Sequence, residues 1–103
     1  MMTREDLLLS KLSEEAGEVV QDVSKCQHFG PDEIYAPVGK SNAERVAHEI
    51  QDLIAVAEML QAEGVLPTYT SEEKRTMRTA KQLKVEEYLE YVRKLGRLSC
   101  PQN

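Results

Sequence analysis

The sequence has few cysteines and few aromatic residues. It has no Trp, one Phe and only two cysteines, Cys26 and Cys100, among 103 residues. Two thiols without CxxC spacing form neither a disulfide framework nor a zinc motif, and we interpret them as incidental reduced thiols. The longest apolar run, Leu53 to Ala57, is far short of the roughly 20 residues that a membrane span needs. The charged start, Met1 to Asp6, has no apolar signal core, so we expect a cytoplasmic protein.

Positive charges are also fewer than negative ones. The chain has 13 basic and 18 acidic residues and a net charge of −5, which disfavours binding to a nucleic-acid polymer. The charges are unevenly placed, because residues 1–63 are strongly acidic whereas residues 71–98 have 8 bases against 5 acids. Such a basic segment either faces a phosphate ligand or simply packs against an acidic helix. The sequence leaves both alternatives open.

Three segments have apolar residues at helical spacing: residues 3–27, 41–63 and 71–98. Each begins with a capping-box pattern, at Thr3–Asp6, Ser41–Glu44 and Thr70–Glu73. No segment alternates like a strand. We therefore predict one all-α domain over residues 1–103, with three long helices, or four if the last one breaks. Because such helices form a thin core, we expect a homodimer or homotetramer that completes a larger helical bundle.

Five carboxylates follow a regular pattern on the first two segments. Written as a pattern, they are EExxE, 30 intervening residues and ExxD: Glu14, Glu15 and Glu18, then Glu49 and Asp52. Residues three or four apart share a helix face, and these carboxylates fall at the edge of each apolar stripe. The inward residues of those stripes include Val20, Val23 and Ile50. If the two stripes pack together, the carboxylates converge along one seam.

Convergent carboxylates repel each other unless a cation lies between them. Mg²⁺ prefers oxygen ligands and often keeps substrate phosphates in its coordination shell, so the pattern favours a phosphate-handling metal site. The plainer alternative is that Glu is a strong helix former and that such pairs arise without any metal. His48-Glu49 is not a zinc helix, because the second His of HExxH is missing. His48 either contacts Asp52, one turn later, or is a surface histidine.

The stretches Lys11–Val19 and Glu49–Leu53 resemble the MazG-type, all-α nucleoside triphosphate pyrophosphohydrolases. The resemblance implies a Mg²⁺-dependent hydrolase, with Mn²⁺ as a substitute, that splits a nucleoside triphosphate into monophosphate and pyrophosphate in a dimeric or tetrameric bundle. Carried over to this chain, it implies four metal ligands: Glu15, Glu18, Glu49 and Asp52. Glu14 matches the first residue of the motif, with the role of orienting or deprotonating the attacking water.

Four basic residues are candidates for binding the phosphates: Lys11, Arg78, Lys81 and Lys84. Lys11, one turn before Glu15, either pairs with Glu15 or reaches the substrate phosphates, and the other three share the basic last segment. Their alternative role is a solvated helix face. Two other functions stay open at this point: a phosphoribosyl-ATP pyrophosphohydrolase and a non-catalytic helical interaction protein.

Overall fold

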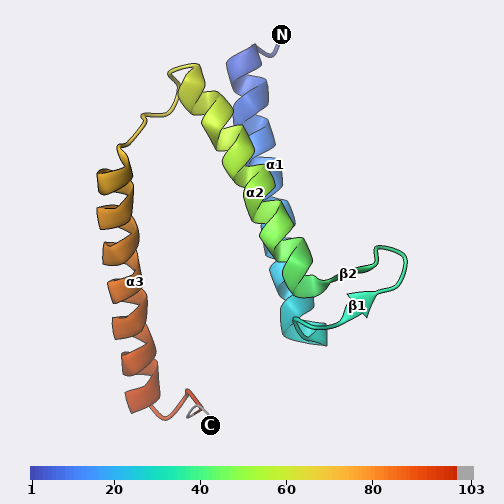
Figure 1. Cartoon of the computed structure of the whole chain (residues 1–103), viewed down its shortest axis with the longest axis vertical. Helices are drawn as coiled ribbons and strands as arrows, with labels where there is room; N and C mark the ends of the chain where they lie inside the picture. Colours follow the sequence, from blue (N-terminus) through green and yellow to red (C-terminus); the bar gives the residue numbers. More distant parts are fainter. Residues whose placement is uncertain (100–103) are drawn as a thin grey trace. The chain divides into compact units, whose positions relative to one another are not determined.

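A computed structural model describes residues 1–99 and shows a helical protein (Figure 1). Its elements are α1 (Arg4–Phe29), β1 (Ile34–Tyr35), β2 (Lys40–Ser41), α2 (Asn42–Ala62) and α3 (Ser71–Lys94). The three predicted helices are confirmed, with ends that differ by up to four residues, and the last one does not break in two. The chain forms two compact units, Met1–Pro67 and a second that begins at Thr68.

The helix starts follow the sequence pattern closely. At Thr3, Ser41 and Thr70, the side-chain hydroxyl accepts a hydrogen bond from the backbone N–H three residues later. The acidic side chain at that later position accepts one from the N–H of the capping residue in return. These reciprocal bonds satisfy backbone donors that have no partner inside a helix. Gly30 caps the end of α1, and its φ of 93° lies in a region that other residues rarely adopt.

A small hairpin connects α1 and α2 (Figure 1). β1 and β2 are antiparallel, with Ile34 opposite Ser41 and Tyr35 opposite Lys40. The expectation that the chain has no strands is therefore wrong at this connection. Strands of two residues are too short to leave an alternating pattern of apolar and polar residues in the sequence.

The first unit is an antiparallel pair of helices, α1 and α2, that lie side by side (Figure 1). Leu8 and Leu60 are the only apolar side chains of the described residues that are buried. Val20 and Ile50, predicted on the inward stripes, are instead 68% and 40% exposed, and Val23 is exposed too. These three predictions are wrong because α1 and α2 face each other along rows that contain acidic residues.

The rows that face each other repeat every three or four residues. On α1 the less exposed positions include Leu8, Leu12, Glu15, Glu18, Val19 and Asp22, and on α2 they include Val46, Glu49, Leu53, Val56 and Leu60. This is the spacing of a helical seam, with apolar contacts at one end and carboxylates towards the other. The seam therefore positions acidic side chains between two helices, where water reaches them only in part.

The second unit contains α3, which buries none of its side chains. Its predicted apolar face is exposed, with Met77, Val85 and Tyr88 at 52%, 42% and 65%. Arg93 bonds Glu90 through two nitrogens, at 2.6 and 2.9 Å, near the end of the helix. None of the helices in residues 1–99 combines the length and apolar character needed to cross a membrane.

Candidate metal centre

Three of the predicted ligands lie together on the α1–α2 seam. Glu15 and Glu18 of α1 and Glu49 of α2 each offer one carboxylate oxygen, and these oxygens lie within 4.8 Å of one another. All three side chains are half-buried. The arrangement follows from the spacing, because residues three apart on α1 share a face and α2 brings the third carboxylate against it. We call these residues the Glu trio.

Two oxygens of the Glu trio have no hydrogen-bond partner among residues 1–99. Glu15 Oε2 and Glu49 Oε2 are buried, and neither accepts a hydrogen bond from the residues that the structure describes. A buried acceptor without a donor is costly, and a buried charge more so. A hard divalent cation would satisfy both oxygens, since Mg²⁺ and Mn²⁺ prefer carboxylate ligands. The donor set therefore fits such an ion.

The pKa values of Glu15 and Glu49 are shifted in the direction that crowding of carboxylates requires. Burial is the main cause that raises the pKa of Glu15, and the charges of Glu18 and Asp52 add to it, whereas Lys11 acts against it. For Glu49, the main cause of a raised pKa is a hydrogen bond shared with the Glu18 carboxyl, followed by burial. That bond exists only while one of the two groups is protonated. When both are ionised, they are two acceptors facing each other.

Asp52, the fourth predicted ligand, borders the trio without belonging to it. Its charge raises the pKa of both Glu15 and Glu49, which shows that it lies close. Asp52 Oδ2 lies 3.5 Å from His48 Nε2, one turn earlier on α2, and the His48 side chain is 59% exposed. His48 is therefore a surface histidine that also contacts Asp52, so both interpretations that the sequence analysis gave for this residue are confirmed.

Glu14 and Lys11 lie at the outer edge of this cluster. Lys11 Nζ contacts Glu14 Oε2 at 3.2 Å, and both side chains are about half exposed. Pairing of Lys11 with Glu15, expected as one alternative, is wrong because the residue three positions on offers a more accessible oxygen. The charge of Glu14 also contributes to the raised pKa of Glu15. Glu14 is thus solvent-accessible and close to the trio.

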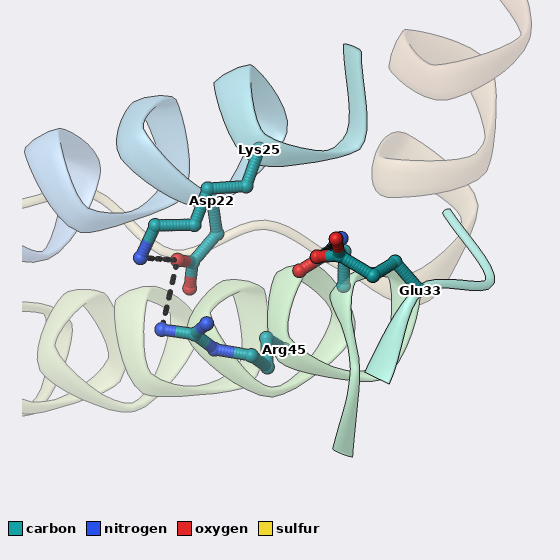
Figure 2. Close-up of polar contacts among 5 residues, drawn as sticks. Asp22, Lys25, Glu33 and Arg45 are labelled. Carbon is teal, nitrogen blue, oxygen red and sulfur yellow. Dashed lines mark hydrogen bonds and ion pairs between the residues drawn. The ribbon is translucent and has the colours of Figure 1, made fainter. Parts of the chain in front are cut away.

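Asp22 is a residue that the sequence analysis missed. Its side chain is almost entirely buried, and its Oδ1 lies 3.5 Å from both Lys25 Nζ and Arg45 Nη2 (Figure 2). Asp22 follows Glu18 by four residues, so helical spacing could have revealed that it shares the carboxylate face. Its two basic partners add positive charge next to the trio.

The predicted phosphate-binding residues of the basic segment lie in the second unit. Arg78, Lys81 and Lys84 are exposed on α3. Arg78 lines a shallow hollow of about 490 Å³ together with Lys74 and Arg75. Their role in phosphate binding stays a prediction. Of the two thiols, Cys26 is half-buried and free, and Cys100 lies outside the described residues.

Comparison of the chain with family models, curated proteins and solved structures finds no match. The assignment of function therefore depends on the chemistry of the Glu trio and its surroundings.

Proposed function

We propose that this protein is a Mg²⁺-dependent nucleotide pyrophosphohydrolase, which hydrolyses a (deoxy)nucleoside triphosphate to the monophosphate and pyrophosphate. The proposal depends on one observation: Glu15 and Glu49 each bury an oxygen that receives no hydrogen bond from residues 1–99, within a trio of carboxylates from two helices. The resemblance of the EExxE and ExxD motifs to MazG-type enzymes adds the reaction and the substrate class. The surrounding charges are consistent with an anionic, metal-bearing substrate.

In this proposal Glu15, Glu18 and Glu49 hold the cation, and Asp52 supports them from the adjacent turn of α2. When bound, the ion neutralises phosphate charge and lowers the pKa of an attacking water. Mn²⁺ would substitute, because it takes the same oxygen ligands. The trio brings three negative charges together, and their mutual repulsion without a cation favours the binding of one.

Glu14 and Lys11 take complementary roles in the proposal. Glu14 lies beside Glu15 and is about half exposed, so it can orient the attacking water and accept its proton. Lys11 is the nearest base on the same helix, and its ammonium group is free to turn from Glu14 to a phosphate oxygen. This exchange would release the Glu14 carboxylate at the moment when substrate arrives.

We further propose that the active form is a homo-oligomeric helical bundle. The first unit buries only two apolar side chains among its residues, and α3 buries none. Large apolar side chains of α1 and α2, among them Val20 and Ile54, stay 68% and 43% exposed. The partner proposed for this exposed apolar face is a second copy of the chain, because symmetric association buries the same surface on both copies.

The test is a pyrophosphate-release assay over the ribo- and deoxyribonucleoside triphosphates and phosphoribosyl-ATP, with Mg²⁺ and with EDTA. We expect Mg²⁺-dependent release from at least one triphosphate and none in EDTA. Glu49→Gln should abolish release, whereas Glu58→Gln, an exposed carboxylate on the same helix, should not. Release from phosphoribosyl-ATP alone would indicate the other pyrophosphohydrolase. No release and no stabilisation by Mg²⁺ or nucleotide would indicate a non-catalytic interaction protein.

A further inference from the structure

A hollow of the first unit lies at the base of the hairpin. Its volume is about 320 Å³, and its lining comes from α1, the hairpin and α2: Lys25, Phe29, Glu33, Tyr35, Asn42 and Arg45. Arg45 also lines the neighbouring hollow that contains Glu18 and Glu49. A ligand that reaches from the metal centre into the hairpin hollow would therefore pass Arg45.

The cations of this region are available to an anion. Arg45 from α2 and Lys25 from α1 converge on the same oxygen of Asp22, each at 3.5 Å (Figure 2). Strong charge-assisted hydrogen bonds between nitrogen and oxygen are about 2.7–2.9 Å long, so neither contact is a tight pair. A guanidinium group has five N–H donors, and Asp22 uses few of them. Arg45 can thus bind a phosphate oxygen without leaving Asp22.

The start of α2 does not supply the anion site. The N–H of Asn42 donates to the Glu33 carbonyl and that of Ala43 to the Pro31 carbonyl, both at 3.0 Å. The N–H of Glu44 donates to Ser41 Oγ at 3.1 Å. These donors, which often bind phosphates at helix starts, are already used. The two basic side chains are therefore the groups that would position a phosphate here.

The Glu33 carboxylate is a hydrogen-bond acceptor that lines the hollow, and the Asn42 side chain holds it in place. Asn42 is only 2% exposed, and its amide donates to the Gly30 carbonyl at 2.9 Å and to Glu33 Oε1 at 3.2 Å. Within residues 1–99, this amide is the only group that hydrogen-bonds the Glu33 carboxylate. The other carboxylate oxygen of Glu33 is thus free to accept a hydrogen bond from a ligand in the hollow.

Two aromatic rings line the same hollow and face solvent. Phe29 is 62% exposed and Tyr35 55% exposed. Exposed aromatic rings in a hollow with basic side chains provide stacking surfaces for nucleobases. The chain has no Trp and one Phe, so Phe29 is one of the few rings that can stack on a base.

We propose that the hairpin hollow binds the nucleoside of the substrate and that Glu33 selects a base with an exocyclic amino group. The proposal rests on the pyrophosphohydrolase function proposed above. An amino group on cytosine, adenine or guanine donates to the carboxylate, whereas uracil and thymine present a carbonyl oxygen in its place. When the Glu33 carboxylate faces this carbonyl oxygen, neither acceptor receives a hydrogen bond, so uracil and thymine bind less tightly. Phe29 and Tyr35 stack on the base, and Arg45 holds the phosphate nearest to the sugar.

CMP and UMP are the probes, because their bases differ in presenting an amino group or a carbonyl oxygen at the same ring position. We would measure their affinity by titration calorimetry with the full chain in Mg²⁺. CMP should bind at least about tenfold more tightly than UMP, within the range that one specific base contact supplies. Glu33→Gln should reduce this ratio to about threefold or less, since its amide also donates to the uracil oxygen.

Two further variants separate selection from charge and folding. Asp32→Asn removes an exposed carboxylate from the adjacent position of the same loop and should leave the CMP-to-UMP ratio unchanged. Arg45→Gln should weaken both nucleotides by a similar factor and keep the ratio. Circular dichroism shows whether each variant is folded.

Equal affinities for CMP and UMP, no binding of either, or an unchanged ratio in folded Glu33→Gln would overturn the proposal. The failure of the proposed function has a different signature. If no triphosphate releases pyrophosphate, the enzyme assignment is wrong whatever the monophosphate ratio is. If CTP and UTP are hydrolysed with equal kcat/KM, the enzyme assignment stands and the base selection is wrong.

Discussion

Glu15 and Glu49 lie on facing helices, and each buries one carboxylate oxygen to which no group in residues 1–99 donates a hydrogen bond. The relationship is specific to the seam, because Glu14, beside Glu15 in sequence, is exposed and has Lys11 as a partner. Two such oxygens on opposite sides of one cluster are unfavourable in the absence of a cation. The first two predictions follow from this pair.

Neutral substitutions in the cluster should remove activity without unfolding the protein. The variants are Glu15→Gln, Glu18→Gln, Glu49→Gln and Asp52→Asn. Each removes a negative charge from the proposed metal site or from beside it. We expect kcat/KM to fall by roughly 100-fold or more, because substitution of residues that only support metal ligands already costs about 10–100-fold. Pyrophosphate release at saturating Mg²⁺ measures the loss, and circular dichroism tests the fold. Full activity in any two of these variants would refute the metal assignment.

The protein without divalent cations should become more stable as the pH falls from neutral towards the ordinary carboxyl range. The pKa values of Glu15 and Glu49 are raised above the ordinary 4.5, so the folded state keeps protons that the unfolded chain releases. This stabilisation is complete below the ordinary value and is lost as the pH rises through the raised folded pKa. The Tm in EDTA, measured between pH 7 and 5, checks the direction.

Two variants test the source of this pH dependence. Glu49→Gln should raise the Tm at pH 7 in EDTA and flatten its dependence on pH, whereas Glu58→Gln should leave both unchanged. Below the ordinary carboxyl pKa of 4.5, the Tm should instead decrease as the pH falls, because hydrogen bonds from Ser41 lower the pKa of Glu44. The contribution of Glu44 is present above that value and is lost as the pH falls through its lowered folded pKa. A lower Tm for Glu49→Gln at pH 7 would contradict the explanation.

Assembly should depend on the exposed apolar face of the first unit. The wild-type protein should sediment as a dimer or tetramer at micromolar concentration, because the chain leaves apolar side chains such as Val20 in water. Val20→Glu should shift the population towards monomer, since association would bury an unpaired charge. Gln27→Glu, another exposed position on α1, is the matched control. A wild-type monomer with cooperative unfolding would refute the prediction.

The basic face of α3 should affect turnover if it contacts the phosphates. The triple variant Arg78→Ala, Lys81→Ala, Lys84→Ala removes three positive charges from exposed positions, so folding should be little changed. A loss of uniform binding would raise KM alone, and a contact strengthened in the transition state would lower kcat. Steady-state kinetics separate the two, with circular dichroism as the control. Unchanged kinetics would place these bases on a solvated face and favour Lys11 and Arg45.

The sequence by itself determined where the helices begin and that carboxylates share a face with the core. Thr3, Ser41 and Thr70 each form a capping box with the acidic residue three positions later. This is a local interaction that the spacing alone reveals. Helical periodicity alone also places Glu15 with Glu18 on one face of α1, and Glu49 with Asp52 on one face of α2. These features require no knowledge of distant contacts.

Only the tertiary structure decided which residues around the carboxylates are buried or paired. Val20 faces water and Asp22 is buried, because the rotation of α1 against α2 depends on contacts between residues far apart in sequence. The contact between Asp22 and Arg45 joins two helices, and no local pattern encodes it. The hairpin likewise forms through backbone pairing of two-residue strands, which leave no periodic signal, and it places Glu33 beside Asn42 at the edge of the proposed site.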